Sequence, residues 1–149
     1  MKKNLPTRKK LRLQDYDYSK ENFYFITICV KNKLQILGEI SKDIIKLTKE
    51  GHIVKQNINK INQFYKNIMI DEFVVMPNHI HILIIINYKN NITISTIIKH
   101  LKTNITRDIK CSIWQKSFYE HIVRNEKEYF KIKEYIKNNV INWKKDKYF

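Results

Sequence analysis

The chain has 149 residues, a length that suits one domain with a hydrophobic core of its own. Its two cysteines, Cys29 and Cys111, form no Cys-x-x-Cys pair, so neither a disulfide framework nor a thiolate zinc site is indicated. The formal net charge of +15 favours a polyanionic partner, most simply nucleic acid. An AT-rich coding sequence, which also enriches Lys, Asn and Ile, would explain part of the same excess.

The two ends of the chain are basic. No stretch is apolar over the roughly 20 residues that a membrane-spanning helix needs, and the Lys-rich start lacks the apolar segment of a signal peptide. We therefore expect a cytoplasmic protein. Residues 1–20, with Arg8 and Arg12, are expected to form an arm that either follows a phosphate backbone or is a solubilising tail. Residues 140–149 are expected to form a basic tail.

Runs of β-branched, aromatic and other apolar residues predict the strands. They lie over residues 23–30, near 36–40, and over 67–76, 79–87 and 117–124. A tight connection at Pro77-Asn78 is expected to join the two strands in the middle of the chain.

Apolar residues at spacings of three and four predict two helices, over residues 43–65 and 93–110. Gly51 lies in the apolar stripe of the first, where it either allows a close approach to the sheet or breaks the helix. The second helix has a basic outer face with Lys99, Lys102 and Arg107. Such a face contacts DNA or is simply solvated.

A third helix is predicted from about 125 to 139. Asn125 suits its N-cap, and Glu128 stands three residues on, as in a capping box. Tyr135 falls outside the apolar stripe, on a polar flank with Asn139 one turn beyond. A tyrosine in such a place is often only a surface residue.

The order strand, helix, strand, strand, helix, strand predicts a ferredoxin-like (RRM-like) α+β sandwich. In this fold an antiparallel sheet carries two helices on one face. The third helix is not part of the ferredoxin-like fold. It could cross the open face of the sheet and bring Tyr135 to that face. No repeat or break in composition divides the chain, so one domain is expected over residues 1–149.

His79 and His81 stand at the head of an apolar strand and project from the same face. Two imidazoles in an apolar setting need partners. A metal ion would satisfy both, and so would hydrogen bonds or solvent. If the third helix covers this face, Tyr135 and Asn139 reach the histidine pair.

That grouping suits attack on a phosphodiester. A divalent cation held by His79, His81 and the Asn139 carbonyl would polarise the phosphate. The oxygen of Tyr135, a phenol with an ordinary pKa near 10, would attack phosphorus and conserve the bond as a phosphotyrosine ester. A free 3′-OH would depart, and cleavage followed by rejoining would need no nucleotide cofactor.

Three blocks of sequence resemble one known family. Met-Pro-Asn-His-Ile-His at 76–81 resembles the His-x-His motif of the single-tyrosine HUH transposases, the insertion-sequence 200-like family. The block at 113–125, from Ile-Trp-Gln to His-x-x-Arg-Asn, resembles the REP-associated tyrosine transposase branch. Glu-Tyr-Ile-Lys-Asn-Asn at 134–139 is similar to the nucleophile helix of that branch, and residues 8–38 are also similar. Together the blocks cover nearly the whole chain in the family's order.

The resemblance implies a DNA transposase: a nuclease and strand transferase that acts on hairpin-forming single-stranded DNA, REP-like or from a transposon end. It implies a Mg²⁺ or Mn²⁺ ion and a 5′-phosphotyrosine intermediate. By position, His79, His81 and Asn139 are its metal ligands and Tyr135 its nucleophile. Related transposases use other amide or carboxylate side chains as the third ligand. This chain departs from the pattern at Val140, where the family commonly has proline.

For some other positions of the family, the sequence does not indicate a role. Trp114, His121 and Arg124 match them, and strand packing and DNA contact are both plausible there. The expected DNA-binding residues are Arg8, Arg12, Lys99, Lys102, Arg107, Trp114, His121 and Arg124. Two other readings stay open: a catalytically inactive hairpin-binding protein derived from a transposase, and a metal-binding sandwich without enzymatic activity. Monomer and helix-swapped homodimer also stay open.

Overall fold

The computed structural model describes residues 21–87 and 92–149, so the predicted arm with Arg8 and Arg12 lies outside the described residues. A four-stranded antiparallel sheet has the strand order β4-β5-β1-β6. Its strands are β1 (Glu21–Cys29), β4 (Ile68–Val75), β5 (His79–Asn87) and β6 (Tyr119–Ile122). This is the ferredoxin-like order, and the predicted α+β class is confirmed.

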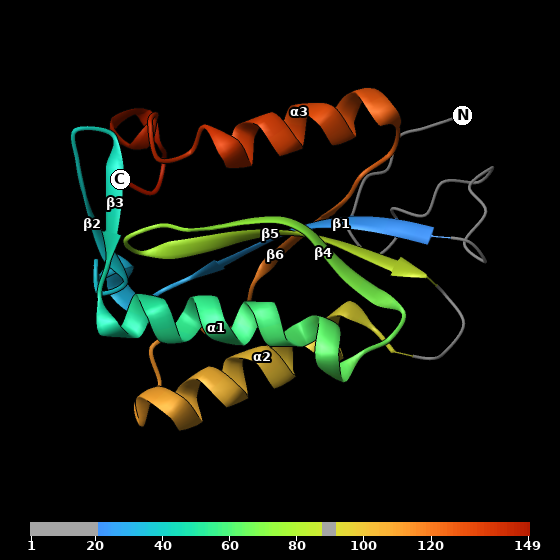
Figure 1. Ribbon diagram of the computed structural model, residues 1–149, viewed down its shortest axis with the longest axis horizontal. Helices are drawn as coiled ribbons and strands as arrows, with labels where there is room; N and C mark the ends of the chain where they lie inside the picture. The colour runs from blue at the N-terminus through green and yellow to red at the C-terminus, as the bar shows by residue number, and fades with distance from the viewer. Residues whose placement is uncertain (1–20, 88–91) are drawn as a thin grey trace.

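The helices lie on both sides of the sheet. Helices α1 (Lys49–Phe64) and α2 (Ile94–Ile109) cover one face, and α3 (Glu126–Lys137) crosses the other (Figure 1). Two short 3₁₀ turns, η2 (Lys31–Lys33) and η3 (Trp143–Lys145), follow β1 and α3. None of the helices in the described part of the chain is long and apolar enough to cross a membrane.

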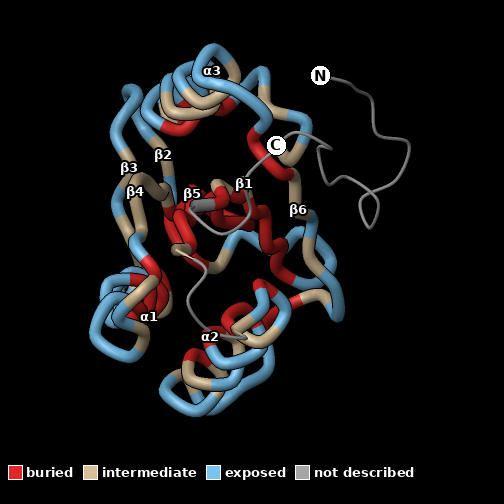
Figure 2. The backbone as a smooth tube through the Cα atoms, turned by 90° about the vertical axis from the view of Figure 1, so that its right-hand side faces the viewer, coloured by how far each residue is buried: buried red, intermediate tan, exposed pale blue. Residues whose placement is uncertain are grey.

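Two hydrophobic clusters hold these layers together. Between the sheet and the first two helices lie the even-numbered isoleucines of β5, together with side chains such as Val54, Ile58 and Ile97. On the other face a smaller cluster joins Leu83 to Val123 and Ile136. The central strands are therefore buried on both faces, as the red segments of β1 and β5 show in Figure 2. This double burial explains why β5 reads as a nearly continuous apolar run.

The predicted start of the first helix is wrong. Ile44–Leu47 form a strand, β3, that pairs with β2 (Gly38–Ser41) in a hairpin. Lys42 and Asp43 make its turn with φ angles of 52° and 63°. A two-residue turn with both φ angles positive matches the twist of a hairpin. The sequence did not predict this turn because it contains no glycine or asparagine. Strand β6 is also shorter than predicted.

Gly51 allows a close approach and does not break α1. A Cβ atom at this position would lie 2.0 Å from the carbonyl oxygen of Leu37. The contact is with the segment before β2 and not with the sheet. The N-cap of α1, Thr48, accepts a hydrogen bond from the Gly51 amide at 3.0 Å and donates its hydroxyl to the Ile36 carbonyl at 2.6 Å. The first turn of α1 is thus fixed against the segment that leads into β2.

Candidate active site

The two histidines lie fully buried at the start of β5, on the face that α3 covers. Their ring centroids are 4.6 Å apart. His79 Nδ1 lies 2.7 Å from Asn78 Oδ1, and His81 Nδ1 lies 2.8 Å from Thr27 Oγ1. Each Nε2 is buried without a hydrogen-bond partner among the described residues. Hydrogen bonds at Nδ1 orient both rings and leave each Nε2 available as a ligand.

Both imidazoles are held neutral. Burial lowers the pKa of His79 to about 3. Burial, with a smaller contribution from neighbouring His79, also lowers the pKa of His81 well below its ordinary value. A buried imidazolium would lose its hydration, so the uncharged form is favoured. The uncharged form is also the one that binds metal ions.

Two oxygen donors complete the cluster, and one of them was not predicted. The Asp146 side chain is only 2% exposed, and its Oδ2 lies 3.8 Å from His79 Nε2. The ligand atoms of His79, His81 and Asp146 all lie within 4.8 Å of one another. Asn139 is 2% exposed and close enough to His79 and Tyr135 to shift the pKa of both. Among the described residues, Asn139 Oδ1 and Asp146 Oδ2 also lack a hydrogen-bond partner.

This donor set fits a divalent ion. Two imidazole nitrogens and a carboxylate oxygen, with an amide oxygen nearby, combine the ligands of transition metals with those of Mg²⁺ and Mn²⁺. Four buried polar atoms without partners would be costly unless something binds to them. The cluster of His79, His81 and Asp146 could therefore hold a metal ion.

Tyr135 lies beside this cluster, as expected if the third helix covers the open face of the sheet. Its ring centroid is 5.3 Å from that of His81 and 6.1 Å from that of Phe25. The side chain is 42% exposed, so its hydroxyl can reach a ligand from solvent. Burial raises the pKa of Tyr135, while the contact with Asn139 opposes this rise. The phenol is therefore protonated at neutral pH.

The position of α3 is fixed by polar contacts at its first turns. Glu128 contacts His121 Nε2 at 2.6 Å and accepts the backbone N–H of Arg124 at 2.7 Å. The N-cap Asn125 accepts the N–H of Glu128 at 2.8 Å, so the capping box is present in a modified form. His121 and Arg124 thus tie β6 to α3.

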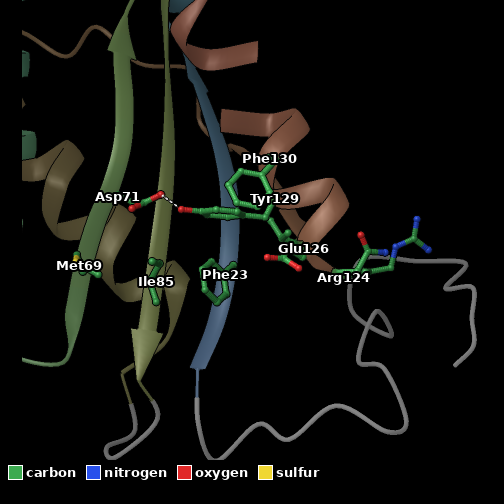
Figure 3. Close-up of a pocket in the computed structure, with 10 residues that line it drawn as sticks. Phe23, Met69, Asp71, Ile85, Arg124, Glu126, Tyr129 and Phe130 are labelled. Atoms are coloured by element: carbon green, nitrogen blue, oxygen red, sulfur yellow. Dashed lines mark hydrogen bonds between the residues drawn. The ribbon is translucent and has the colours of Figure 1, made fainter. Parts of the chain in front are cut away.

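A pocket of about 570 Å³ lies under this end of α3. Its lining includes Phe23 and Phe130 but neither histidine nor Tyr135. Figure 3 shows Tyr129 reaching across it from α3 to Asp71 on β4, to which its hydroxyl donates at 2.7 Å. This bond anchors α3 on the sheet.

The other predicted DNA contacts lie apart from the cluster. Trp114 is 4% exposed and bridges to Val30, which favours a packing role. The Lys102 ammonium donates to three consecutive carbonyls of the loop before β6, at 2.8, 3.3 and 3.1 Å. Lys99 and Arg107 are exposed on α2, across the sheet from Tyr135.

The C-terminal residues pack onto the site. The Tyr148 ring centroid lies 4.4 Å from that of His79, and Trp143 stacks on His79 at 6.2 Å. Asn78 Nδ2 donates to the Tyr148 carbonyl at 2.6 Å, and burial raises the pKa of the Tyr148 phenol to about 12. The expected basic tail is therefore part of the folded site, and it supplies Asp146. A lone carboxylate among the lysines of this tail was the available sequence signal.

Comparison with known proteins places the chain in the family of a bacterial protein of unassigned activity. No family model matches. An uncharacterized protein of Haemophilus influenzae is 38% identical over 167 aligned positions, covering 95% of this chain and 93% of the relative. The chain belongs to the same family as that protein.

Two solved structures show the fold. A REP-associated tyrosine transposase bound to a REP hairpin has a TM-score of 0.68 and 24% identity, covering 89% of this chain and 74% of that one. A candidate transposase from Deinococcus radiodurans R1 has a TM-score of 0.56 and 18% identity, covering 85% and 95%.

Proposed function

We propose that this protein is a DNA transposase or single-strand endonuclease of the REP-associated tyrosine type, with Tyr135 as its nucleophile. One observation carries the proposal: Tyr135 lies against His81, at the edge of a cluster of buried ligand atoms without partners. The fold shared with a tyrosine transposase bound to a REP hairpin adds support.

His79, His81 and Asp146, with Asn139 beside them, would hold Mg²⁺ or Mn²⁺. A bound ion supplies electrophilic polarisation of a phosphodiester at this place. The chain's own contribution is orientation. Thr27 and Asn78 hold the Nδ1 atoms, and burial keeps both rings uncharged.

Tyr135 performs the transfer. Its phenolic oxygen forms a bond to phosphorus, and the bond from phosphorus to the 3′ oxygen breaks. The departing 3′ oxygen leaves as a 3′-OH, and the proton that it gains replaces the one lost by the phenol. The product is a 5′-phosphotyrosine ester, and attack by another 3′-OH reverses the step. Asn139 helps because its contact with the hydroxyl of Tyr135 favours the ionised phenol.

The substrate we propose is single-stranded DNA that folds into a hairpin, REP-like or from a transposon end. The net charge of +15 suits a polyanion, and the solved relative is bound to a REP hairpin. The site would work in a monomer or a homodimer, and the substrate would be reached in the cytoplasm.

A denaturing gel tests the proposal with a pool of labelled single-stranded hairpins in Mn²⁺ or EDTA. We expect protein-linked DNA in Mn²⁺ only, absent from Tyr135→Phe. Tyr65→Phe is the matched control, because it removes a phenol hydroxyl at the end of α1, on the opposite face of the sheet from the histidines. An adduct that persists in Tyr135→Phe would refute the nucleophile. Hairpin binding on a native gel without any adduct would identify the inactive binding protein instead.

A further inference from the structure

The strand register places a row of side chains on the open face, from the histidines to the sheet edge. Thr27 on β1 is the Cα partner of both His81 on β5 and Tyr119 on β6. Directly paired residues face the same side of a sheet, so Tyr119 faces the side of His81, about 10 Å away across two strand spacings. The row ends at the edge strand β6.

A groove of about 460 Å³ runs beside this row. Thr27, which holds His81, and Tyr148, which lies over both histidines, form part of its lining. Tyr119 lines the side toward β6. The groove therefore lies next to the candidate active site, with Thr27 and Tyr148 between it and the histidines.

The chemistry of the groove is aromatic and cationic. Tyr119 is 57% exposed, so its ring is open to a ligand from solvent. Lys33 and Lys147, both exposed, reach the groove from segments far apart in the sequence, and Lys147 Nζ lies 5.3 Å from the Tyr148 ring centroid. Glu120 also lines the groove, so its two lysines outnumber this carboxylate. An exposed ring flanked by cations suits an unpaired base with its phosphate.

We propose that this groove binds one unpaired nucleotide of the single strand beside the bond that Tyr135 attacks. The base stacks on Tyr119, and the phosphate lies between Lys33 and Lys147. The volume lies within the range of small-ligand sites. A duplex fits poorly because its bases already stack on each other and cannot reach the ring. This inference rests on the proposed function, and it names the contact that selects single strands.

Fluorescence anisotropy with labelled oligothymidylate tests the groove without knowledge of the cleavage sequence. Base stacking contributes roughly 1–3 kcal/mol, so Tyr119→Ala should weaken binding about 5- to 150-fold. Tyr119→Phe should bind as the wild type does, because stacking needs only the ring. Because both lysines contact the same phosphate, Lys33→Ala combined with Lys147→Ala should reduce the steepness of log affinity against log salt by about 0.7.

Phe64→Ala and Lys60→Ala, an exposed ring and an exposed cation on α1, are the matched controls and should leave the affinity unchanged. Wild-type affinity in Tyr119→Ala would overturn the inference, and so would equal losses in Tyr119→Phe and Tyr119→Ala. If the wild type forms a DNA adduct while Tyr119→Ala binds normally, the nucleotide-binding role of the groove is wrong and the proposed function stands. If binding depends on Tyr119 but no hairpin gives an adduct, the proposed function fails and the groove stands.

Discussion

Exchanging Asp146 for asparagine separates two roles of its buried carboxylate. Oδ1 accepts the N–H of Tyr148 at 2.8 Å, which an amide oxygen can also do. Oδ2 lies 3.8 Å from His79 Nε2 and has no hydrogen-bond partner within residues 21–87 and 92–149. The variant keeps the shape and the bond to Tyr148, removes the charge, and offers an N–H to His79. We therefore expect a more stable metal-free protein that binds Mn²⁺ more weakly.

The expected magnitudes follow from the cost of an unpaired buried group. That cost is roughly 1–3 kcal/mol, and 1 kcal/mol shifts the Tm by about 2–4 °C in a chain of this size. With about 1–1.5 kcal/mol recovered, the Tm of Asp146→Asn in EDTA should rise by about 2–6 °C. In the wild type, Mn²⁺ at about 100 times its Kd should add about 2.7 kcal/mol. If the variant binds Mn²⁺ at least tenfold more weakly, the same Mn²⁺ concentration should stabilise it by about half of that amount or less.

Thermal unfolding followed by circular dichroism, in EDTA and in Mn²⁺, measures both effects. Glu39→Gln is the matched control because it removes an exposed carboxylate on β2 that does not belong to the cluster of His79, His81 and Asp146. It should change neither the metal-free Tm nor the Mn²⁺ response. If Asp146→Asn gains as much Tm from Mn²⁺ as the wild type does, the carboxylate is not a ligand and the reasoning is wrong.

Three further predictions concern the fold around the site. In EDTA, the free energy of unfolding should fall as the pH drops from about 6.5 to about 3, by up to about 1.4 kcal/mol per pH unit for His79. Unfolded His79 takes up a proton in this range, whereas burial has lowered the pKa of the folded side chain to about 3. Lys102→Met should cost about 1.5–3 kcal/mol, because one charged donor holds three loop carbonyls. Gly51→Ala should cost about 3 kcal/mol, because the added Cβ would meet the Leu37 carbonyl at 2.0 Å.

Urea unfolding measures all three, and each has its own control. His79→Asn should have a shallower pH dependence than the wild type; an identical profile would contradict the assignment to His79. Lys99→Ala, an exposed change on the same helix as Lys102, should stay within about 0.5 kcal/mol of the wild type. An equal loss of stability in Lys99→Ala and Lys102→Met would show that the hydrogen bonds from Lys102 to the loop do not stabilise the fold. A neutral Gly51→Ala would show that the segment before β2 can move away from α1.

Local patterns in the sequence were enough to predict the core architecture. Strong apolar runs and helical spacings gave the four sheet strands, α2 and α3, and the pairing order follows from the ferredoxin-like plan. The alternation of side chains in β5 placed His79 and His81 on the open face of the sheet, and helix periodicity placed Tyr135 outside the apolar stripe of α3. These features depend on neighbours close in sequence, which a pattern can show. The contact between Tyr135 and His81 was expected only if α3 crossed that face, as it does.

The rest depends on contacts between distant segments. Asp146 becomes buried because the chain folds back from α3 over β5, and no local pattern shows such a return. Lys102 looked like a surface cation, yet its ammonium holds the loop before β6. Ile44–Leu47 fitted a helical stripe as well as a strand, and only the pairing with β2 decides between them.

The central claim is that Tyr135 becomes covalently linked to DNA. Mass spectrometry of peptides from the protein, treated with hairpin DNA and Mn²⁺ and then with nuclease, tests it most directly. We expect a nucleotide phosphate on the peptide that contains Tyr135, found in Mn²⁺ and absent in EDTA. The same modification on Tyr148 or Tyr129, with Tyr135 unmodified, would contradict it.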